Sequence, residues 1–206
     1  VDILYLHRYD DETPLEESIE ALVALQSEGL IRYIGVSNFA AWQTVNANNI
    51  AKALGSRIDV AQPMYNLVKR QAEVEILPAC FDQDIAVFNY SPLGGGLLTG
   101  KYARGETGRL DDVDMYAKRY APDWMRDAAG RLLAISEEIG VSPATLAVAW
   151  SAYHPAITSP LISARSAEQL QPSLDALSFD MSAELYDEIS ALTPRPSPAT
   201  DRLEEV

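Results

Sequence analysis

The feature that most constrains the fold is a repeated alternation of short apolar stretches with longer amphipathic ones. Each apolar stretch has the length and the β-branched or aromatic content of a strand. These stretches lie at residues 3–6, 31–36, 58–63, 85–90 and 156–162. The amphipathic stretches predict helices at residues 14–28, 41–54, 71–82, 123–139, 143–153, 166–177 and 183–192. Strands that alternate with helices predict an α/β protein with a parallel sheet.

Local signals fix the expected helix ends. Thr13 and Glu16 have the spacing of a capping box, with Pro14 at the first helical position, so a helix should begin at Pro14. Ser142 is expected to cap the helix that follows it, and Ser166 begins a second capping box. Residues 94–122 are expected to form a long loop, which in a compact domain is usually functional or mobile.

Polar side chains follow each predicted strand at the point where the strand ends. Because the carboxyl ends of parallel strands meet at one edge, where ligands bind in α/β folds, these side chains should share one site. They are His7, Ser37, Asn38, Gln62, Tyr90, Ser91 and the stretch 163–165.

The fourth strand leads into a stretch suited to a flat ring joined to phosphates. Tyr90 could stack on the ring, and the backbone N–H groups of Gly94, Gly95 and Gly96 could approach the phosphates closely, with Lys101 nearby. An ordinary glycine-rich turn is the alternative. The dinucleotide fingerprint GxGxxG is absent after the first strand. A site spread over successive strand ends favours a barrel, although a complete (β/α)8 barrel needs eight strands and about 250 residues.

Composition narrows the classes of protein. The chain has 206 residues, 48% of them hydrophobic, which suits one domain with a sizeable core. A net charge of −14 disfavours a nucleic-acid partner. One cysteine and two histidines predict neither a disulfide framework nor a metal site. No apolar run approaches the ~18 residues of a membrane span. A first residue of Val1, already at a strand, suggests a piece of a longer protein.

Several motifs together carry a family resemblance. The runs VDILYLHR, GLIRYIGVSNF, VAQPMYNL, YSPLGGGLLTGKY and SPLISARSAEQL occur in that order. They resemble the aldo-keto reductases, specifically the bacterial and potassium-channel-β-subunit-like branch. The resemblance covers residues 1–192 and implies the C-terminal part of a TIM barrel, a partial (β/α)8 barrel of roughly units 4 to 8. Residues 193–206 would be a terminal tail.

The resemblance implies an oxidoreductase that reduces aldehydes or ketones to alcohols by hydride transfer from NADPH. His7 matches the family's catalytic histidine, which orients the carbonyl oxygen. The family's tyrosine acid, lysine and aspartate would lie on the first three units, which this sequence does not contain. The alternative is a non-catalytic NADP-binding or regulatory module. A cytoplasmic location is expected, and the oligomeric state is left open.

The resemblance also implies a set of cofactor-binding residues. Ser37, Asn38 and Gln62 would hydrogen-bond the nicotinamide carboxamide, and Tyr90 would stack on the nicotinamide ring. Arg109 would close over the cofactor. The pyrophosphate and ribose would lie along Ser91, Pro92, Leu93, Gly94, Gly95 and Lys101. At the adenosine end are Ser163, where the family commonly has glycine, Arg165 and Gln169.

Simpler structural roles are the alternatives for these residues. His7 and Tyr90 could serve packing alone, and Ser37 with Asn38 could form an ordinary strand-end turn. Lys101 and Arg109 could be solvated loop residues. Edges of parallel sheet are rarely left open. We therefore expect either an open, truncated barrel or a barrel completed by another chain.

Overall fold

A four-stranded parallel sheet organises the chain. The structure is a computed structural model that describes residues 1–202 and 204, so positions 203, 205 and 206 of the predicted tail lie outside the description. The strands follow the order β1 (Ile3–Leu6), β2 (Tyr33–Ser37), β3 (Val60–Gln62) and β4 (Ala86–Val87). Tyr5 pairs with Gly35, and Ser37 pairs with Gln62. The predicted α/β class with a parallel sheet is confirmed.

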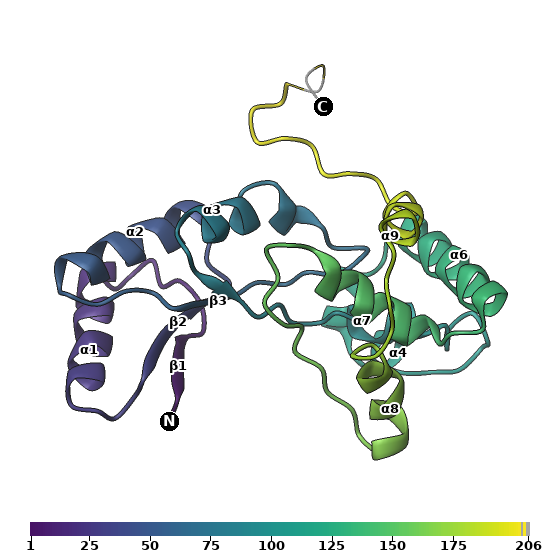
Figure 1. Cartoon of the computed structure of the whole chain (residues 1–206), viewed down its shortest axis with the longest axis horizontal. Coiled ribbons are helices and arrows are strands. Elements are labelled where there is room, and N and C mark those ends of the chain that lie inside the picture. The colour runs from purple at the N-terminus through teal and green to yellow at the C-terminus, as the bar shows by residue number, and fades with distance from the viewer. Residues whose placement is uncertain (203, 205–206) are drawn as a thin grey trace.

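One face of the sheet is covered by helices. These are α1 (Leu15–Ser27), α2 (Ala41–Ala53) and α3 (Ile76–Asp82), which lie together on one side of the strands in Figure 1. Ile34, Val36 and Val87 point to this side and are almost fully buried in the hydrophobic core. Successive side chains of a strand point to opposite faces of the sheet, so every second side chain enters the core.

Two predicted helix starts differ from the structure. Helix α1 begins at Leu15, not at Pro14, and no side chain caps it, because the Thr13 hydroxyl donates to an Asp10 carboxylate oxygen at 2.6 Å instead. The helix predicted over 71–82 is split into a short 3-10 turn, η1 (Gln71–Glu73), and α3. Pro78 explains the break, because its ring clashes with a helical carbonyl four residues earlier and it lacks the N–H that would bond there.

The strand predicted at 156–162 is not formed as a strand. The segment does run beside β4, since the Thr158 backbone N–H donates to the Val87 carbonyl at 2.9 Å and Leu161 N–H donates to the Asn89 carbonyl at 2.8 Å. The Val87 N–H, however, bonds the Thr158 hydroxyl at 3.0 Å and not a backbone carbonyl. Pro160 also has no N–H to donate. A regular ladder therefore does not develop.

The segment predicted as one long loop contains short helices. They are η2 (Gly94–Thr99), α4 (Arg109–Asp112) and α5 (Asp114–Arg119). The remaining helices are α6 (Asp123–Ile139), α7 (Pro143–Tyr153), α8 (Ala167–Asp175) and α9 (Ala183–Ser190). Ser142 and Ser166 cap α7 and α8 as predicted, each with its hydroxyl oxygen accepting a backbone N–H of the first turn.

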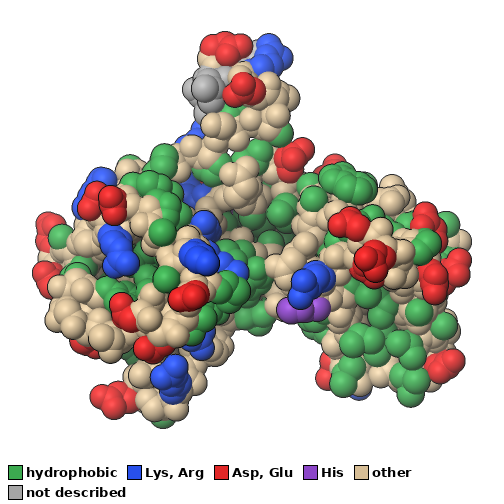
Figure 2. All heavy atoms as spheres, turned by 180° about the vertical axis from the view of Figure 1, so that it is seen from behind, with side chains coloured by type: hydrophobic (Ala, Val, Ile, Leu, Met, Phe, Trp, Pro, Cys, Tyr) green, Lys and Arg blue, Asp and Glu red, His purple; other side chains and the backbone are tan. Residues whose placement is uncertain are grey.

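The second face of the sheet is less well covered. Tyr5, Gln62 and Phe88 are partly exposed there, and Tyr33 is 50% exposed. Within the described residues, the outer edge of β1 pairs with no strand. Seen from behind, the molecule has an open notch between the lobe of α1 and α2 and the lobe of α6 to α8 (Figure 2).

No single helix in the described part of the chain is both long enough and apolar enough to span a membrane. Helices α6 and α7 meet these two criteria only when taken together, and they are bent by 103° relative to each other.

Candidate functional site

A hydrogen-bond network joins the carboxyl ends of all four strands. The Tyr90 hydroxyl donates to the Asn38 amide oxygen at 2.6 Å. The Asn38 amide nitrogen donates to the His7 carbonyl at 2.9 Å and to the Ser37 hydroxyl at 3.2 Å. The Ser37 hydroxyl donates to the Gln62 carbonyl at 2.9 Å. The structure therefore brings together five of the strand-end residues that the sequence analysis singled out, with His7 and Gln62 taking part through their backbone carbonyls.

Backbone conformation aims Asn38 into this network. Its φ is +56°, in the left-handed region that asparagine tolerates better than most residues. The turn directs the side chain across the strand ends, so that both ends of the amide are used. Ser37 is 2% exposed, whereas Asn38 stays accessible at the surface.

Tyrosines within the site remain protonated well into the alkaline range. Partial burial raises the pKa of Tyr90 above its usual value, with the nearby Arg119 charge opposing the shift. Burial likewise raises the pKa of Tyr5, and its hydrogen bond with Gln62 opposes that shift. Both phenols are thus hydrogen-bond donors at neutral pH.

His7 lies at the end of β1, with its imidazole exposed. Its backbone carbonyl, and not its ring, takes part in the strand-end network. In the described part of the chain, no hydrogen bond or ion pair engages the ring. The imidazole is therefore available to a ligand on the less covered side of the sheet.

The turn after β4 is built from left-handed residues. Ser91 has φ +59°, and Gly94, Gly95 and Gly96 have φ +58°, +65° and +99°. A Cβ added at Gly95 would lie 2.8 Å from the Tyr116 ring. Glycine is thus required at Gly95 both by its backbone and by a tyrosine packed on it. Pro92 is buried, and Leu93 is partly buried.

Of the predicted cations of the long segment, Lys101 lies beside the glycine turn, because a Cβ added at Gly96 would lie 3.5 Å from its ammonium nitrogen. The Lys101 ammonium packs against the Gly108 backbone and lies 4.8 Å from the Tyr102 ring centroid. The guanidinium of Arg109 lies 5.7 Å from the Tyr116 ring centroid, and that of Arg119 lies 5.4 Å from it. Arg119, which the sequence analysis did not consider, is the arginine whose charge reaches Tyr90.

The residues predicted for the adenosine end surround the start of α8. The Arg165 backbone N–H donates to the Gln169 side-chain oxygen at 3.3 Å, and Ser163 is exposed just before it. The bond from Leu161 to Asn89 attaches this loop to the end of β4. Among the described residues, no hydrogen bond or ion pair joins the Arg165 guanidinium to the strand-end network.

Two further residues of the site were missed. Asn66 is fully buried, and its amide nitrogen donates to the Ser91 carbonyl at 2.9 Å and to the Tyr120 hydroxyl at 3.4 Å. Asn66 stands in the run VAQPMYNL, so its position after β3 was a usable signal. Tyr120 lies 54 residues from Asn66, and no local pattern indicates that contact.

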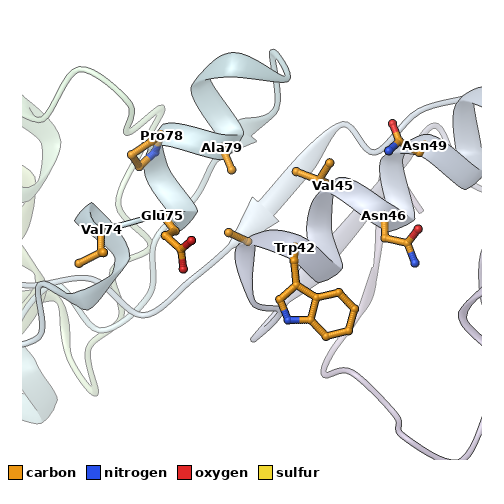
Figure 3. Close-up of a pocket in the computed structure, with 9 residues that line it drawn as sticks. Trp42, Val45, Asn46, Asn49, Val74, Glu75, Pro78 and Ala79 are labelled. Atoms are coloured by element: carbon orange, nitrogen blue, oxygen red, sulfur yellow. The ribbon is translucent and has the colours of Figure 1, made fainter. Parts of the chain in front are cut away.

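A separate groove lies elsewhere on the molecule. It has a volume of about 530 Å³ and runs between α2 and α3 on the helical side of the sheet (Figure 3). Trp42, Val45 and Pro78 line it, together with the Glu75 carboxylate and two asparagines. None of the predicted site residues belongs to its lining, so the groove and the strand-end network are separate features.

Nearly the whole chain is similar to known proteins. A sequence model described as "Aldo/keto reductase family" matches residues 1–194. The chain is 32% identical to "Uncharacterized oxidoreductase YrpG" of Bacillus subtilis (strain 168), over 97% of this chain and 60% of the relative. It is 34% identical to "Probable voltage-gated potassium channel subunit beta" of Oryza sativa subsp. japonica, over 100% of this chain and 61% of the relative.

A third relative is "L-glyceraldehyde 3-phosphate reductase" of Escherichia coli (strain K12), 30% identical over 86% of this chain and 53% of the relative. The chain thus spans little more than half the length of these relatives. The family match nonetheless covers nearly every residue, including the whole strand-end network. This chain belongs to the aldo/keto reductase family.

Proposed function

We propose that this chain is the NADPH-binding part of an oxidoreductase that reduces aldehydes or ketones. The observation that carries the proposal is the network in which Tyr90, Asn38 and Ser37 converge at the strand ends. Family membership supports the reaction class, and the names of two relatives describe an oxidoreductase and an aldehyde-type reductase.

The donor set fits a nicotinamide ring. A carboxamide presents one acceptor and one donor group, and Asn38, Gln62 and Ser37 offer both kinds of partner. Asn38 donates to Ser37, and Ser37 donates to the Gln62 backbone carbonyl, so a bound carboxamide would compete with these bonds. The half-buried Tyr90 ring can support one face of the nicotinamide and thereby fix which face is offered to a carbonyl. NADPH would supply the hydride.

The phosphate end fits less tightly. The backbone at Gly94 and Gly95 allows a pyrophosphate to approach closely. Ser91, Pro92 and Leu93 would lie along the same pyrophosphate. Lys101 already borders this turn at Gly96, whereas Arg109 would need to turn from its contact with the Tyr116 ring to reach it. Arg165, with Ser163 and Gln169, would meet an adenosine 2′-phosphate, which favours NADP over NAD because a guanidinium pairs well with a phosphate.

We further propose that residues 1–192 form roughly units 4 to 8 of a (β/α)8 barrel. Three observations support this arrangement: the strands are parallel, no described strand pairs with the outer edge of β1, and the second face is partly exposed. His7 would orient a carbonyl oxygen. A general acid would have to come from outside the chain described here, because the tyrosine, lysine and aspartate of the family motif have no counterparts in it.

Carbonyl turnover tests this assignment. The purified 206-residue chain should bind NADPH but should not reduce 4-nitrobenzaldehyde at rates typical of a complete enzyme, because proton transfer to the developing alkoxide is unassisted. The measurement is NADPH oxidation followed at 340 nm. Turnover at such rates would contradict the proposed division of the site.

A non-catalytic NADP-binding or regulatory module is the second candidate. The similarity to a protein named as a potassium channel β subunit favours it. An assay of a protein that also carries the first three units of the barrel separates the two. NADPH binding without oxidation on addition of carbonyls would support the module, and oxidation would support the reductase.

A further inference from the structure

Asn66 occupies a fixed position between β3 and the turn after β4. Its backbone exchanges hydrogen bonds with Lys69, at 3.2 and 2.9 Å, and its side-chain oxygen accepts the Val68 N–H at 3.1 Å. The side chain is fully buried. The orientation of the amide is therefore set by its own tight turn, and the amide nitrogen is directed away from it.

That nitrogen holds a strained residue. Ser91 has φ +59°, a conformation that costs a non-glycine residue on the order of 1 kcal/mol. The Ser91 carbonyl accepts two bonds, from Asn66 at 2.9 Å and from the Gly94 N–H at 2.9 Å. The Asn66 bond is the one supplied from another part of the chain, and it stabilises the turn in its left-handed form.

The second contact of Asn66 lies at the end of the segment 101–120. The Tyr120 hydroxyl accepts from the amide nitrogen at 3.4 Å, and the Tyr120 ring is fully buried. A Cβ added at Gly95 would lie 3.2 Å from this ring. Tyr120 therefore contacts Asn66 directly and packs on the turn that Asn66 holds.

We propose that Asn66 is a positioning residue that couples the packing of segment 101–120 to the shape of the turn at 91–95. Loss of the Asn66 amide would release Ser91 and Tyr120 together. The inference rests on the proposed function in one respect, namely that this turn faces the NADPH pyrophosphate. The coupling itself follows from contacts that need no cofactor.

Limited trypsin digestion tests the coupling without nucleotide. Segment 101–120 contains cleavage sites at Lys101, Arg109 and Lys118, while Lys52 in α2 reports general unfolding. Asn66→Ala should raise the cleavage rate in the segment about five-fold or more relative to the rate at Lys52, the size expected for loss of one buried hydrogen bond.

Asn48→Ala is the matched control. Asn48 is also fully buried, and its amide accepts the Ile58 N–H at 3.0 Å and donates to Gln83 at 3.2 Å, remote from the turn. It should not raise segment cleavage relative to Lys52 cleavage, because any local loosening lies in α2, where Asn48 and Lys52 both donate to the Gln83 side-chain oxygen. Equal acceleration at both sites in Asn66→Ala would overturn the proposal, because that result marks general destabilisation.

Tyr120→Phe removes one hydroxyl and tests the same link more gently. It should raise the cleavage rate in segment 101–120. The double variant should be cleaved at the same rate as Asn66→Ala alone, because both substitutions remove the hydrogen bond between Asn66 and Tyr120. Additive effects would overturn the coupling.

Titration with NADPH forms the second arm. Asn66→Ala should weaken binding about five-fold or more, whereas Asn48→Ala should not. If the wild-type chain binds no NADPH, the proposed function fails, and the digestion ratios still decide the coupling. Weakening of equal size in both variants would overturn the positioning role.

Discussion

At the scale of single residues, Tyr90 combines two roles that can be separated. Its hydroxyl donates to Asn38 at 2.6 Å, which helps hold the strand-end network. Its ring is half buried and is the aromatic surface proposed to support the nicotinamide. Hydrogen bonds of this kind contribute about 1 kcal/mol, and aromatic stacking on a flat ring contributes about 1–3 kcal/mol.

Substitution at Tyr90 should separate the two roles. Tyr90→Phe keeps the ring, so we expect a loss of about 1 kcal/mol in the free energy of unfolding and a change of less than about three-fold in the Kd for NADPH. Tyr90→Ala should raise that Kd about ten-fold or more. Urea unfolding and a fluorescence titration measure the two quantities. Similar Kd values for Tyr90→Ala and wild type would show that the ring makes no contact with the cofactor.

At the scale of elements, a buried polar cluster ties η1 to the C-terminal helix. Arg70 and Glu73 pair at 2.8 Å, with side chains only 11% and 15% exposed. The Tyr65 hydroxyl donates to Glu73, and Arg70 donates to the Ser190 carbonyl at the end of α9. The Arg70 guanidinium also lies 5.6 Å from the Trp150 ring centroid on α7. Three separate helices thus meet on one ion pair.

Removing the charge of Glu73 should be costly. Glu73→Gln leaves the buried Arg70 without its counter-charge, and we expect a loss of about 3 kcal/mol in the free energy of unfolding. Glu106→Gln is the control, because the Arg104–Glu106 pair is more than half exposed and should contribute less than about 1 kcal/mol. Urea unfolding of both variants measures the difference. Equal losses would mean that burial does not strengthen the Glu73 pair.

His154, which follows α7, adds a pH dependence. Burial lowers its pKa below 6.5, with the Glu73 charge opposing the shift, and its Nδ1 accepts the Ala156 N–H. The unfolded chain therefore takes up a proton first as the pH falls below about 6.5. Stability is fully present above that pH and decreases as the pH falls toward the folded pKa. His154→Gln should lose less stability than wild type between pH 7.5 and 5.5 in urea unfolding. The same loss in both proteins would exclude His154 as the titrating group.

The elements also show what sequence alone can predict. Apolar runs located β1 to β4, and serines located the starts of α7 and α8, because each signal is local. The predicted fifth strand does not form, because the Thr158 hydroxyl accepts the Val87 N–H in place of a backbone carbonyl. Helices α4 and α5 were missed because α4 packs on η2 and Tyr116 of α5 packs on Gly95, contacts that no local pattern indicates. The strand-end residues were found together, since parallel strands bring their carboxyl ends to one edge.

At the scale of the whole molecule, the proposed site occupies one end of a sheet whose second face is partly exposed. Helices α1, α2 and α3 cover the first face, and the notch in Figure 2 lies between the two lobes. The chain has a net charge of −14, which repels the anionic NADPH. Binding therefore requires positively charged side chains close to the phosphates. Lys101, Arg109 and Arg165 are cations among the proposed contacts, and the charge of Arg119 reaches Tyr90.

Calorimetric titration of NADPH into the 206-residue chain tests the central claim most directly, with Asn38→Ala as the paired variant. Asn38 donates to His7 and Ser37 and accepts from Tyr90, so its loss removes the centre of the strand-end network. We predict saturable binding to wild type, with a Kd at least about ten-fold weaker in the variant. Absence of NADPH binding to the folded wild-type chain, or equal affinity in both proteins, would contradict the account.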